Sequence, residues 1–427
     1  MTTLAFALFL VLIALLGAPL FAVIGAVALV GFHALGVSLA AVPMEIYRLA
    51  DTPVLLALPL FTFAGYVLAE SNTSQRIVRL TRCFLGWLPG GLAVVAVVAC
   101  AFFTAFTGAT GVTIVALGAL LYPALVSDGY KDSFSLGLVT TSGSLGILLP
   151  PSLPLIIYGI VVQQMDTGYP VTISGLFLAG VFPMLIMTML LCLWGLWTNR
   201  KGGLGVTRFS SKEALAALRD AAWEIPLPFL VLGGIYGGVF AVSEAAAVTA
   251  LYVLVVEVFI YREVPLKKLG AIMRESMVMV GGILLILGVA LASSTFLIDA
   301  QVPARLFDII QAHVHGKIVF LLLLNILLLF LGCILDIFSA LVIMVPLIVP
   351  VAASYGIHPV HLGIIFCANM QIGYLTPPVG MSLFIASYRF RKPIPEIYKA
   401  AIPFMLVLLA ALVLITYWPA LSMFLVR

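Results

Sequence analysis

The chain has 427 residues, of which 63% are hydrophobic and 9% are charged, and its formal net charge is +4 at pH 7. Soluble domains carry about 25% charged residues, so this chain lacks the polar atoms that would cover a water-facing surface. Apolar stretches long enough to cross a bilayer as helices recur along its length. This composition excludes a soluble enzyme, a nucleic-acid-binding protein and a disordered regulator. It also disfavours an outer-membrane barrel, whose strands alternate polar and apolar residues. The sequence predicts an all-α, polytopic membrane protein.

Nine stretches predict single membrane-spanning helices. The first is interpreted as a retained helix because it lacks the basic n-region of a signal peptide. A polar cytoplasmic linker, 199–224, separates two halves of the chain, and segments 72–86 and 298–313 predict amphipathic helices at the membrane surface. The five cysteines form no CxxC pair, so no disulfide framework or zinc site is predicted. The nine stretches are 4–36, 53–71, 133–164, 173–198, 225–241, 242–260, 271–297, 361–387 and 400–426.

Two further apolar stretches, 89–126 and 317–353, are too long for a single crossing, and each is interrupted at its middle. The first interruption reads TGATG from Thr107, and the second reads GCILD up to Asp336. We expect each stretch to form a helical hairpin that enters and leaves on the same side. Backbone without hydrogen-bond partners is too costly in lipid, so each tip must be buried in protein or line a water-filled cavity.

The basic residues support this topology through the positive-inside rule. If both long stretches are re-entrant, 17 of the 21 Lys and Arg residues fall on one side of the membrane. A full crossing by either stretch would reverse every later loop and destroy this bias. The sequence therefore predicts a multi-pass inner-membrane protein with a cytoplasmic N-terminus and a C-terminus on the outside. The two hairpins then enter from opposite faces.

An internal repeat indicates the same architecture. When the chain is shifted by 227 residues without gaps, nine of the 51 positions of 110–160 are identical in 337–387, and five of those nine are Gly or Pro. Repeats of opposite membrane direction are typical of secondary transporters. We expect a first inverted repeat over 1–198 and a second over 225–427. The matching Gly and Pro pairs are Pro123 and Pro350, Gly129 and Gly356, Gly146 and Gly373, Pro150 and Pro377, and Pro151 and Pro378.

The most specific motif is a duplicated G-x-x-x-P-P, which begins at Gly146 and again at Gly373. Two consecutive prolines remove two backbone donors and clash with the preceding turn, so neither helix can run through. We expect broken helices over 133–164 and 361–387, in which freed carbonyls coordinate a cation and half-helix N-termini face an anion. The alternative is an ordinary proline kink. Polar residues flank both breaks: Thr140, Thr141, Ser142, Ser144 and Ser152 in one, and Asn369, Gln371 and Thr376 in the other.

The hairpin tips supply further candidates. Asp336 has no basic neighbour in sequence, so it either contributes to an ion site or caps the following half-helix. Thr107 and Thr110, with Gly108 between them, form either a backbone-and-hydroxyl site for sodium or a plain turn. No intramembrane Lys or Arg marks a carboxylate site, so a substrate carboxylate would meet helix N-termini or charge from a loop folded inward.

Other polar residues have structural interpretations. Glu244 is expected to cap a helix start, and Glu257 is expected to reach the cytoplasmic interface. His313, His315, His358 and His361 are expected to be solvated loop residues. The chain contains no HExxH, GxSxG, GxxxxGK[ST] or GxGxxG pattern, so an enzyme is not predicted.

These features resemble the large membrane subunit of tripartite ATP-independent periplasmic (TRAP) transporters. The resemblance covers nearly the whole chain and is most specific in the PPS and NxxxGxLTPPVG stretches. It implies an elevator fold of the ion-transporter superfamily, in which two hairpins and two broken helices move against a scaffold. The first tip of the family is often serine-rich, whereas here it reads TGATG. The matching stretches are 107–118, 143–159, 335–350 and 358–384.

The resemblance also implies site residues, with Na⁺ as the coupling ion and an organic acid as substrate. A first sodium would lie between the first tip and first break, at Thr107, Gly108, Thr110, Ser142, Gly143, Gly146 and Pro150. A second would lie between the second tip and second break, at Gly332, Asp336, Gly373 and Thr376. The substrate, a C4-dicarboxylate, sialic acid or similar carboxylate, would lie near Ser152, Asn369, Thr376, Pro377 and Pro378.

Two partners follow from the same resemblance: a small membrane (Q) subunit and a periplasmic solute-binding (P) protein. The leading interpretation is a sodium-coupled, binding-protein-dependent importer subunit. A stand-alone carboxylate carrier coupled to protons or sodium is the nearest alternative. A membrane enzyme or scaffold is the alternative from a different class, and it leaves the paired helix breaks unexplained.

Overall fold

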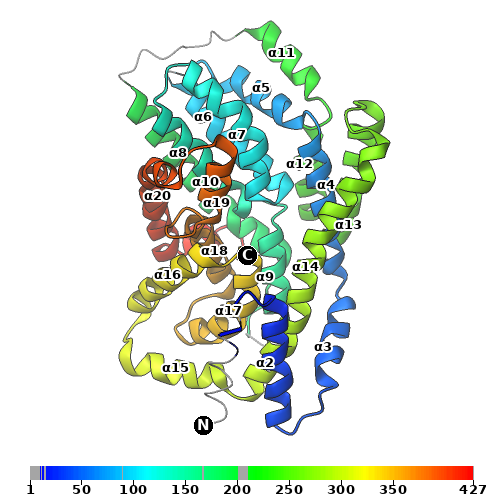
Figure 1. The fold of residues 1–427 in the computed structure, drawn as a ribbon, viewed down its shortest axis with the longest axis vertical. Helices are drawn as coiled ribbons and strands as arrows, with labels where there is room; N and C mark the ends of the chain where they lie inside the picture. Colours follow the sequence, from blue (N-terminus) through cyan, green and yellow to red (C-terminus); the bar gives the residue numbers. More distant parts are fainter. Residues whose placement is uncertain are drawn as a thin grey trace.

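The computed structural model describes residues 10, 12–13, 16–88, 90–165, 168–200 and 210–426. All regular structure in these ranges is helical, and nine helical segments are long and apolar enough to cross a membrane. Helices suit this sequence because they satisfy every backbone hydrogen bond within the segment. The all-helical, multi-span prediction is confirmed. Two surface helices, α5 (Thr73–Leu85) and α11 (Ser211–Asp220), lie at one end of the molecule, and α15 (Val302–His313) lies at the other (Figure 1).

The N-terminal stretch departs from the single helix predicted over 4–36. Gly17 has a φ of +92°, in the left-handed region, and Pro19 immediately precedes α2 (Leu20–Ala34). A proline has no N–H to donate and clashes with a preceding helical turn, so the helix restarts here. A short helix that was not predicted, α3 (Ala41–Ala50), follows α2.

One side of the molecule is built around α14 (Leu266–Asp299), a helix of 34 residues that packs against α2, α3 and α4 (Figure 1). α4 spans Ala57–Glu70 and packs against α13 (Val242–Leu254), which continues as a π-helical turn to Ile260. The predicted crossing over 225–241 is wrong, because α12 covers only Pro226–Tyr236 and ends before Gly238, whose φ is +70°. We refer to α2, α3, α4, α12, α13 and α14 as the framework.

The other side holds two hairpins and two broken helices that correspond between the halves. Each hairpin consists of two helices joined by two residues, and each broken helix consists of two segments separated by the double proline. In the first half these are α6 (Gly91–Thr107) with α7 (Thr110–Ser127), and α8 (Asp132–Ser142) with a 3₁₀ turn (Leu145–Leu148) and α9 (Leu153–Gln163). In the second half they are α16 (Lys317–Ile334) with α17 (Ile337–Ser354), and α18 (Pro359–Gly373) with α19 (Met381–Phe390).

Two long helices complete this side. α10 (Ile173–Asn199) packs against α6 and the first broken helix, and α20 (Ile394–Tyr417) packs against α8 and α10. The short α21 (Ala420–Met423) follows α20. Gly137 allows the approach of α20, because a Cβ there would lie 2.1 Å from the Ala400 carbonyl oxygen.

An ionic cluster ties α5 to the framework. Arg76 on α5 forms ion pairs with Glu224, with Glu257 at 3.3 Å and with Glu263 at 2.5 Å. Glu257 is fully buried, so the expectation that it reaches the interface is wrong; it also accepts a hydrogen bond from Thr73. Because a buried carboxylate is costly without a partner, Arg76 is required to compensate it.

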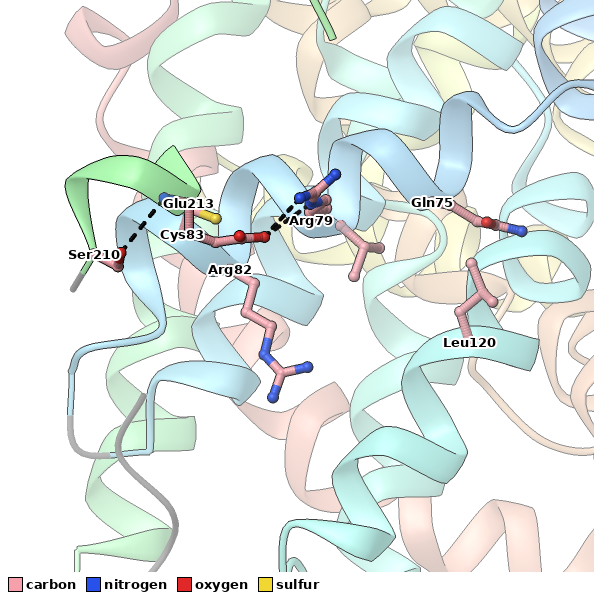
Figure 2. A pocket seen from close by; sticks show the side chains of 8 residues that line it. Gln75, Arg79, Arg82, Cys83, Leu120, Ser210 and Glu213 are labelled. Carbon is pink, nitrogen blue, oxygen red and sulfur yellow. Dashed lines mark hydrogen bonds and ion pairs between the residues drawn. The ribbon is translucent and has the colours of Figure 1, made fainter. Parts of the chain in front are cut away.

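A second contact joins α5 to α11. A cavity of about 530 Å³ is bounded by α5, α7 and the start of α11. Figure 2 shows the side chains that line it. At its wall Glu213 accepts hydrogen bonds from Arg79 at 2.7 and 3.0 Å, and its backbone N–H donates to the Ser210 hydroxyl that caps α11. These residues are more exposed than the Arg76 cluster, so their pairing contributes little to stability.

Candidate functional site

Each hairpin packs closely against the break of the broken helix in its own half of the chain. A Cβ on Gly146 would lie 2.4 Å from the Ala101 carbonyl oxygen of α6. A Cβ on Gly373 would lie 2.6 Å from the Cα of Gly332 on α16. Because Gly146 and Gly373 are equivalent in the predicted repeat, the same backbone contact occurs in both halves. Only glycine fits at either position.

The predicted residues of the first sodium site mostly lie together. Thr107, Thr110 and Ser142 are buried, and Gly143 lies so close to α7 that its Cβ would be 3.6 Å from the Thr110 carbonyl oxygen. The Thr107 and Ser142 hydroxyls donate to carbonyls one turn back, which leaves their oxygens free to accept or coordinate. Pro150 differs, because it lines a separate apolar cavity of about 210 Å³ that faces α10 and α12.

Two threonines that the sequence interpretation missed connect the first hairpin with the first break. The Thr104 hydroxyl lies 2.9 Å from the Gly143 carbonyl oxygen and 2.8 Å from the Thr113 hydroxyl. Both threonines are fully buried. Thr104 lies four residues before Gly108, and Thr113 lies three residues after Thr110, so each is one helical turn from the tip. This spacing is the signal that could have identified them from the sequence.

The second tip is organised around Asp336. Its carboxylate accepts hydrogen bonds from the Ser339 N–H at 3.0 Å and the Ser339 hydroxyl at 2.5 Å, so it caps α17. The Ile337 N–H donates to the Tyr374 hydroxyl at 2.7 Å, a link between tip and break that was not predicted. Thr376 donates to the Ile372 carbonyl at 3.1 Å. Of the two roles predicted for Asp336, capping of the following helix is thus observed.

The predicted substrate residues differ in burial and in hydrogen bonding. Ser152 is buried and caps α9 through the Leu155 N–H, whereas Pro377 and Pro378 are exposed. Asn369 is fully buried, and its side-chain amide donates to Asn325 on α16 at 2.7 Å. Ser152 therefore stabilises a helix end, and Asn369 joins two helices, in this conformation.

A buried polar chain continues from Asn369 toward the C-terminus. Asn325 donates to the Thr416 hydroxyl at 3.2 Å, and His361 contacts the Thr416 carbonyl at 3.2 Å and the Ser422 hydroxyl at 2.6 Å. The expectation of a solvated His361 is wrong, because α18 begins at Pro359 and carries this residue into the protein interior. Glu244 does act as expected, since it accepts a hydrogen bond from the Ala241 N–H at 2.8 Å.

The two hairpin tips meet at a cavity of about 660 Å³ against the framework. Gly108 and Thr110 line it from the first tip and Asp336 from the second, while Glu70 of α4 and Glu275 of α14 line it from the framework. The described lining residues include these three carboxylates and no Lys, Arg or His. A ligand in this cavity could contact both hairpin tips and the framework at once.

Comparisons with known proteins give the family. A family model described as "Tripartite ATP-independent periplasmic transporter, DctM component" matches residues 6–421. The isethionate TRAP transporter permease DctMQ of Oleidesulfovibrio alaskensis is 33% identical over 426 residues, covering 98% of this chain and 65% of that protein. The chain thus spans about two thirds of the length of this relative.

Two further relatives match over most of both chains. The C4-dicarboxylate TRAP transporter large permease DctM of Rhodobacter capsulatus is 35% identical, covering 86% of each chain. The ectoine/5-hydroxyectoine TRAP transporter large permease UehC of Ruegeria pomeroyi is 32% identical, covering 97% of this chain and 96% of that protein.

The fold is similar to that of a solved transporter. The crystal structure of the YdaH transporter of Alcanivorax borkumensis superposes with a TM-score of 0.64 at 17% identity, covering 89% of this chain and 87% of that chain. The paired hairpins and breaks thus occur in a chain whose sequence matches a transporter family over nearly its full length. The chain belongs to the DctM family, the large permease components of TRAP transporters, and is a transport protein rather than an enzyme.

Proposed function

We propose that this chain is the large subunit of a sodium-coupled, binding-protein-dependent importer of a small organic acid, working by an elevator mechanism. The observation that carries the proposal is the duplicated contact of a hairpin with a glycine at a helix break, Gly146 against α6 and Gly373 against Gly332. Such contacts make each hairpin and its broken helix one packed unit. Two units of this kind, related as inverted repeats, would move together against the framework.

The coupling ions would be held where each tip meets its break. The first sodium would bind between Thr107, Gly108 and Thr110 on the hairpin and Ser142 and Gly143 at the break. The second would bind between Gly332 and Asp336 on the hairpin and Gly373 and Thr376 at the break. Hydroxyl, carboxylate and carbonyl oxygens at unwound backbone are the ligands that helix breaks offer to hard cations. Either ion would favour the closed contact of tip and break.

The position of the cavity between the tips supports the proposal that this conformation faces inward. Its framework residue Glu70 is the last residue of α4 and precedes α5, which lies with α11 at one end of the molecule (Figure 1), and Lys268 pairs with Glu70 at 3.4 Å. The positive-inside rule assigns this end to the cytoplasm, with the C-terminus in the periplasm of the bacterial inner membrane. A bound substrate would then leave toward the cytoplasm from the conformation described.

The remaining parts of the transport system come from other chains. The relative named DctMQ joins two permease components in one longer protein, which supports association of this chain with a separate small Q subunit. A periplasmic P protein would deliver substrate to the opposite face. Isethionate, C4-dicarboxylates and ectoine, named for relatives, define the range of substrates that we consider.

The first test is the melting temperature of the purified subunit against NaCl, with KCl and choline chloride at equal ionic strength. Sodium at about 100 times its dissociation constant stabilises the folded state by roughly 2.7 kcal/mol, so a sodium-specific rise is expected. Equal curves in the three salts would contradict sodium coupling and favour the proton-coupled alternative. Uptake into proteoliposomes with the Q subunit present, and with the P protein present or absent, separates the importer from a stand-alone carrier.

A further inference from the structure

The cavity between the hairpin tips has an uneven charge distribution, which bears on the substrate class. At the second tip, the N-terminus of α17 is already occupied by the carboxylate of Asp336. At the first tip, the N-cap of α7 is Ala109, which has no side-chain oxygen and makes no capping hydrogen bond. The first N–H groups of a helix have no partners within the helix, so those at the start of α7 remain available. The two tips therefore differ in their ability to accept an anion.

A second observation at the first tip points to a ligand. Thr110, the first residue of α7, lines the cavity and is 7% exposed, and its hydroxyl has no hydrogen-bond partner among the described residues. A hydroxyl that faces a cavity without a partner in the protein is available to a ligand. With the N–H groups of Gly111 and Val112, which also line the cavity, this hydroxyl forms a set of donors that fits a carboxylate.

The opposite wall has the chemistry of a cation site. Of the three lining carboxylates, Asp336 is capped onto α17 and Glu70 pairs with Lys268, whereas Glu275 forms no salt bridge within the described part of the chain. The aromatic side chains of Tyr66 and Phe338 line the same cavity. Aromatic faces and a carboxylate together are the groups that bind organic cations.

Nearby basic side chains do not neutralise the negative charge of Glu275. Lys268 is engaged by Glu70, and Arg389 donates to the Val115 carbonyl at 3.0 Å without being a lining residue. A ligand with two negative charges would place one of them near Glu275, an exposed carboxylate with no Lys, Arg or His among the lining residues beside it. A ligand with one carboxylate and one positive charge would satisfy both walls.

We propose that the substrate of this carrier is a small organic zwitterion, whose carboxylate binds Thr110 and the start of α7 and whose cationic group lies between Tyr66, Phe338 and Glu275. This rests on the proposed function and deepens it by selecting a substrate class. Framework residues such as Glu275 would contact the cationic group in the inward-facing conformation.

The experiment uses the full chain in lipid nanodiscs at saturating NaCl, with ligand affinity followed by isothermal titration and melting temperature. Three probes are compared. Ectoine is a carboxylate with a delocalised cation, succinate is a dianion of similar size, and isethionate is a sulfonate anion. Ectoine is expected to bind, with succinate and isethionate weaker by about tenfold or more, because a charge-assisted contact is lost. Glu275→Gln is expected to weaken ectoine binding by about tenfold, and it is informative because Glu275 belongs to neither proposed sodium site.

Asp299→Asn is the matched control, because Asp299 is an exposed carboxylate at the far end of the same helix and does not line the cavity. It should leave ectoine binding unchanged. Tighter binding of succinate than of ectoine, or an ectoine affinity unaffected by Glu275→Gln, would overturn the zwitterion proposal while sodium-dependent stabilisation remained. A melting temperature of the wild-type chain that does not respond to sodium would instead contradict the proposed function itself.

Discussion

Gly373, at the end of α18, lies against Gly332 on α16 so closely that a Cβ on Gly373 would be 2.6 Å from the Gly332 Cα. The same atom on Gly332 would be 3.1 Å from the Gly373 Cα. The obstacle at both positions is backbone, which cannot move aside as a flexible side chain can. The second hairpin and the second break are therefore fitted to each other at the level of the main chain.

Gly373→Ala and Gly146→Ala are each expected to destabilise the protein by about 1–3 kcal/mol, because the added methyl group overlaps backbone atoms. The control is Gly281→Ala on α14, where a Cβ has no atom within 4 Å. That substitution should be neutral or slightly stabilising, since Ala favours a helix over Gly by roughly 0.5–1 kcal/mol. Reversible unfolding in mixed micelles measures all three. Equal stability of the wild type and Gly373→Ala would show that the contact tolerates adjustment.

Substitutions at Asp336 separate a helix cap from an ion ligand. Asp336→Asn keeps a capping oxygen but removes the charge, so it should cost little stability in the absence of sodium. If the carboxylate also serves an ion, the sodium-dependent rise in melting temperature should become smaller. Ser339→Ala removes one of the hydrogen bonds to Asp336 and retains the charge, so it provides the opposite comparison. If the sodium-dependent rise in melting temperature is unchanged in Asp336→Asn, the carboxylate acts as a helix cap and not as an ion ligand.

Arg76→Gln should be far more damaging than Arg79→Gln, although both residues lie on α5. Arg76 neutralises the fully buried Glu257, and removal of one partner of a buried pair typically costs about 3–5 kcal/mol. Arg79 and its partners are about half exposed and screened by water, so its loss should cost far less stability than the loss of Arg76. Similar unfolding free energies for the two variants would contradict the burial described for the Arg76 cluster. Arg76→Gln with Glu257→Gln should recover part of the loss, since no uncompensated charge then remains at position 257.

The stability contributed by Glu263 should depend on pH. Burial alone would raise the pKa of this carboxyl, but hydrogen bonds from the Asn72 N–H and from Arg76 outweigh it and hold the pKa below its usual range. A carboxyl with a depressed folded-state pKa contributes stability above its unfolded-state pKa and loses it as the pH falls through the folded-state value. The difference in unfolding free energy between wild type and Glu263→Gln should therefore shrink on acidification from pH 7 toward pH 3. A difference that stays constant over this range would contradict the shift.

Hydropathy and proline chemistry account for what could be predicted about the fold. The hairpin interruptions fell at the correct residues, because Gly108 ends α6 with a φ of +64° and Asp336 starts α17 as its cap. Glycine and a capping carboxylate act through the local backbone, so their effects can be read without tertiary contacts. The turn at Gly17 was not predicted, because the long apolar stretch around it has the hydropathy of one continuous helix.

The sequence by itself determined that this is a multi-span helical carrier of the DctM family, with paired breaks at Pro150 and Pro377. Hydrophobic length and missing backbone donors are properties of short segments, so they require no knowledge of neighbours. Only the tertiary structure decided that Glu257 is buried with Arg76, that Asn369 pairs with Asn325, and that Thr110 and Glu275 line one cavity. These pairs are separated by 44 to 181 residues in the chain, and hydropathy carries no information about which distant polar groups meet.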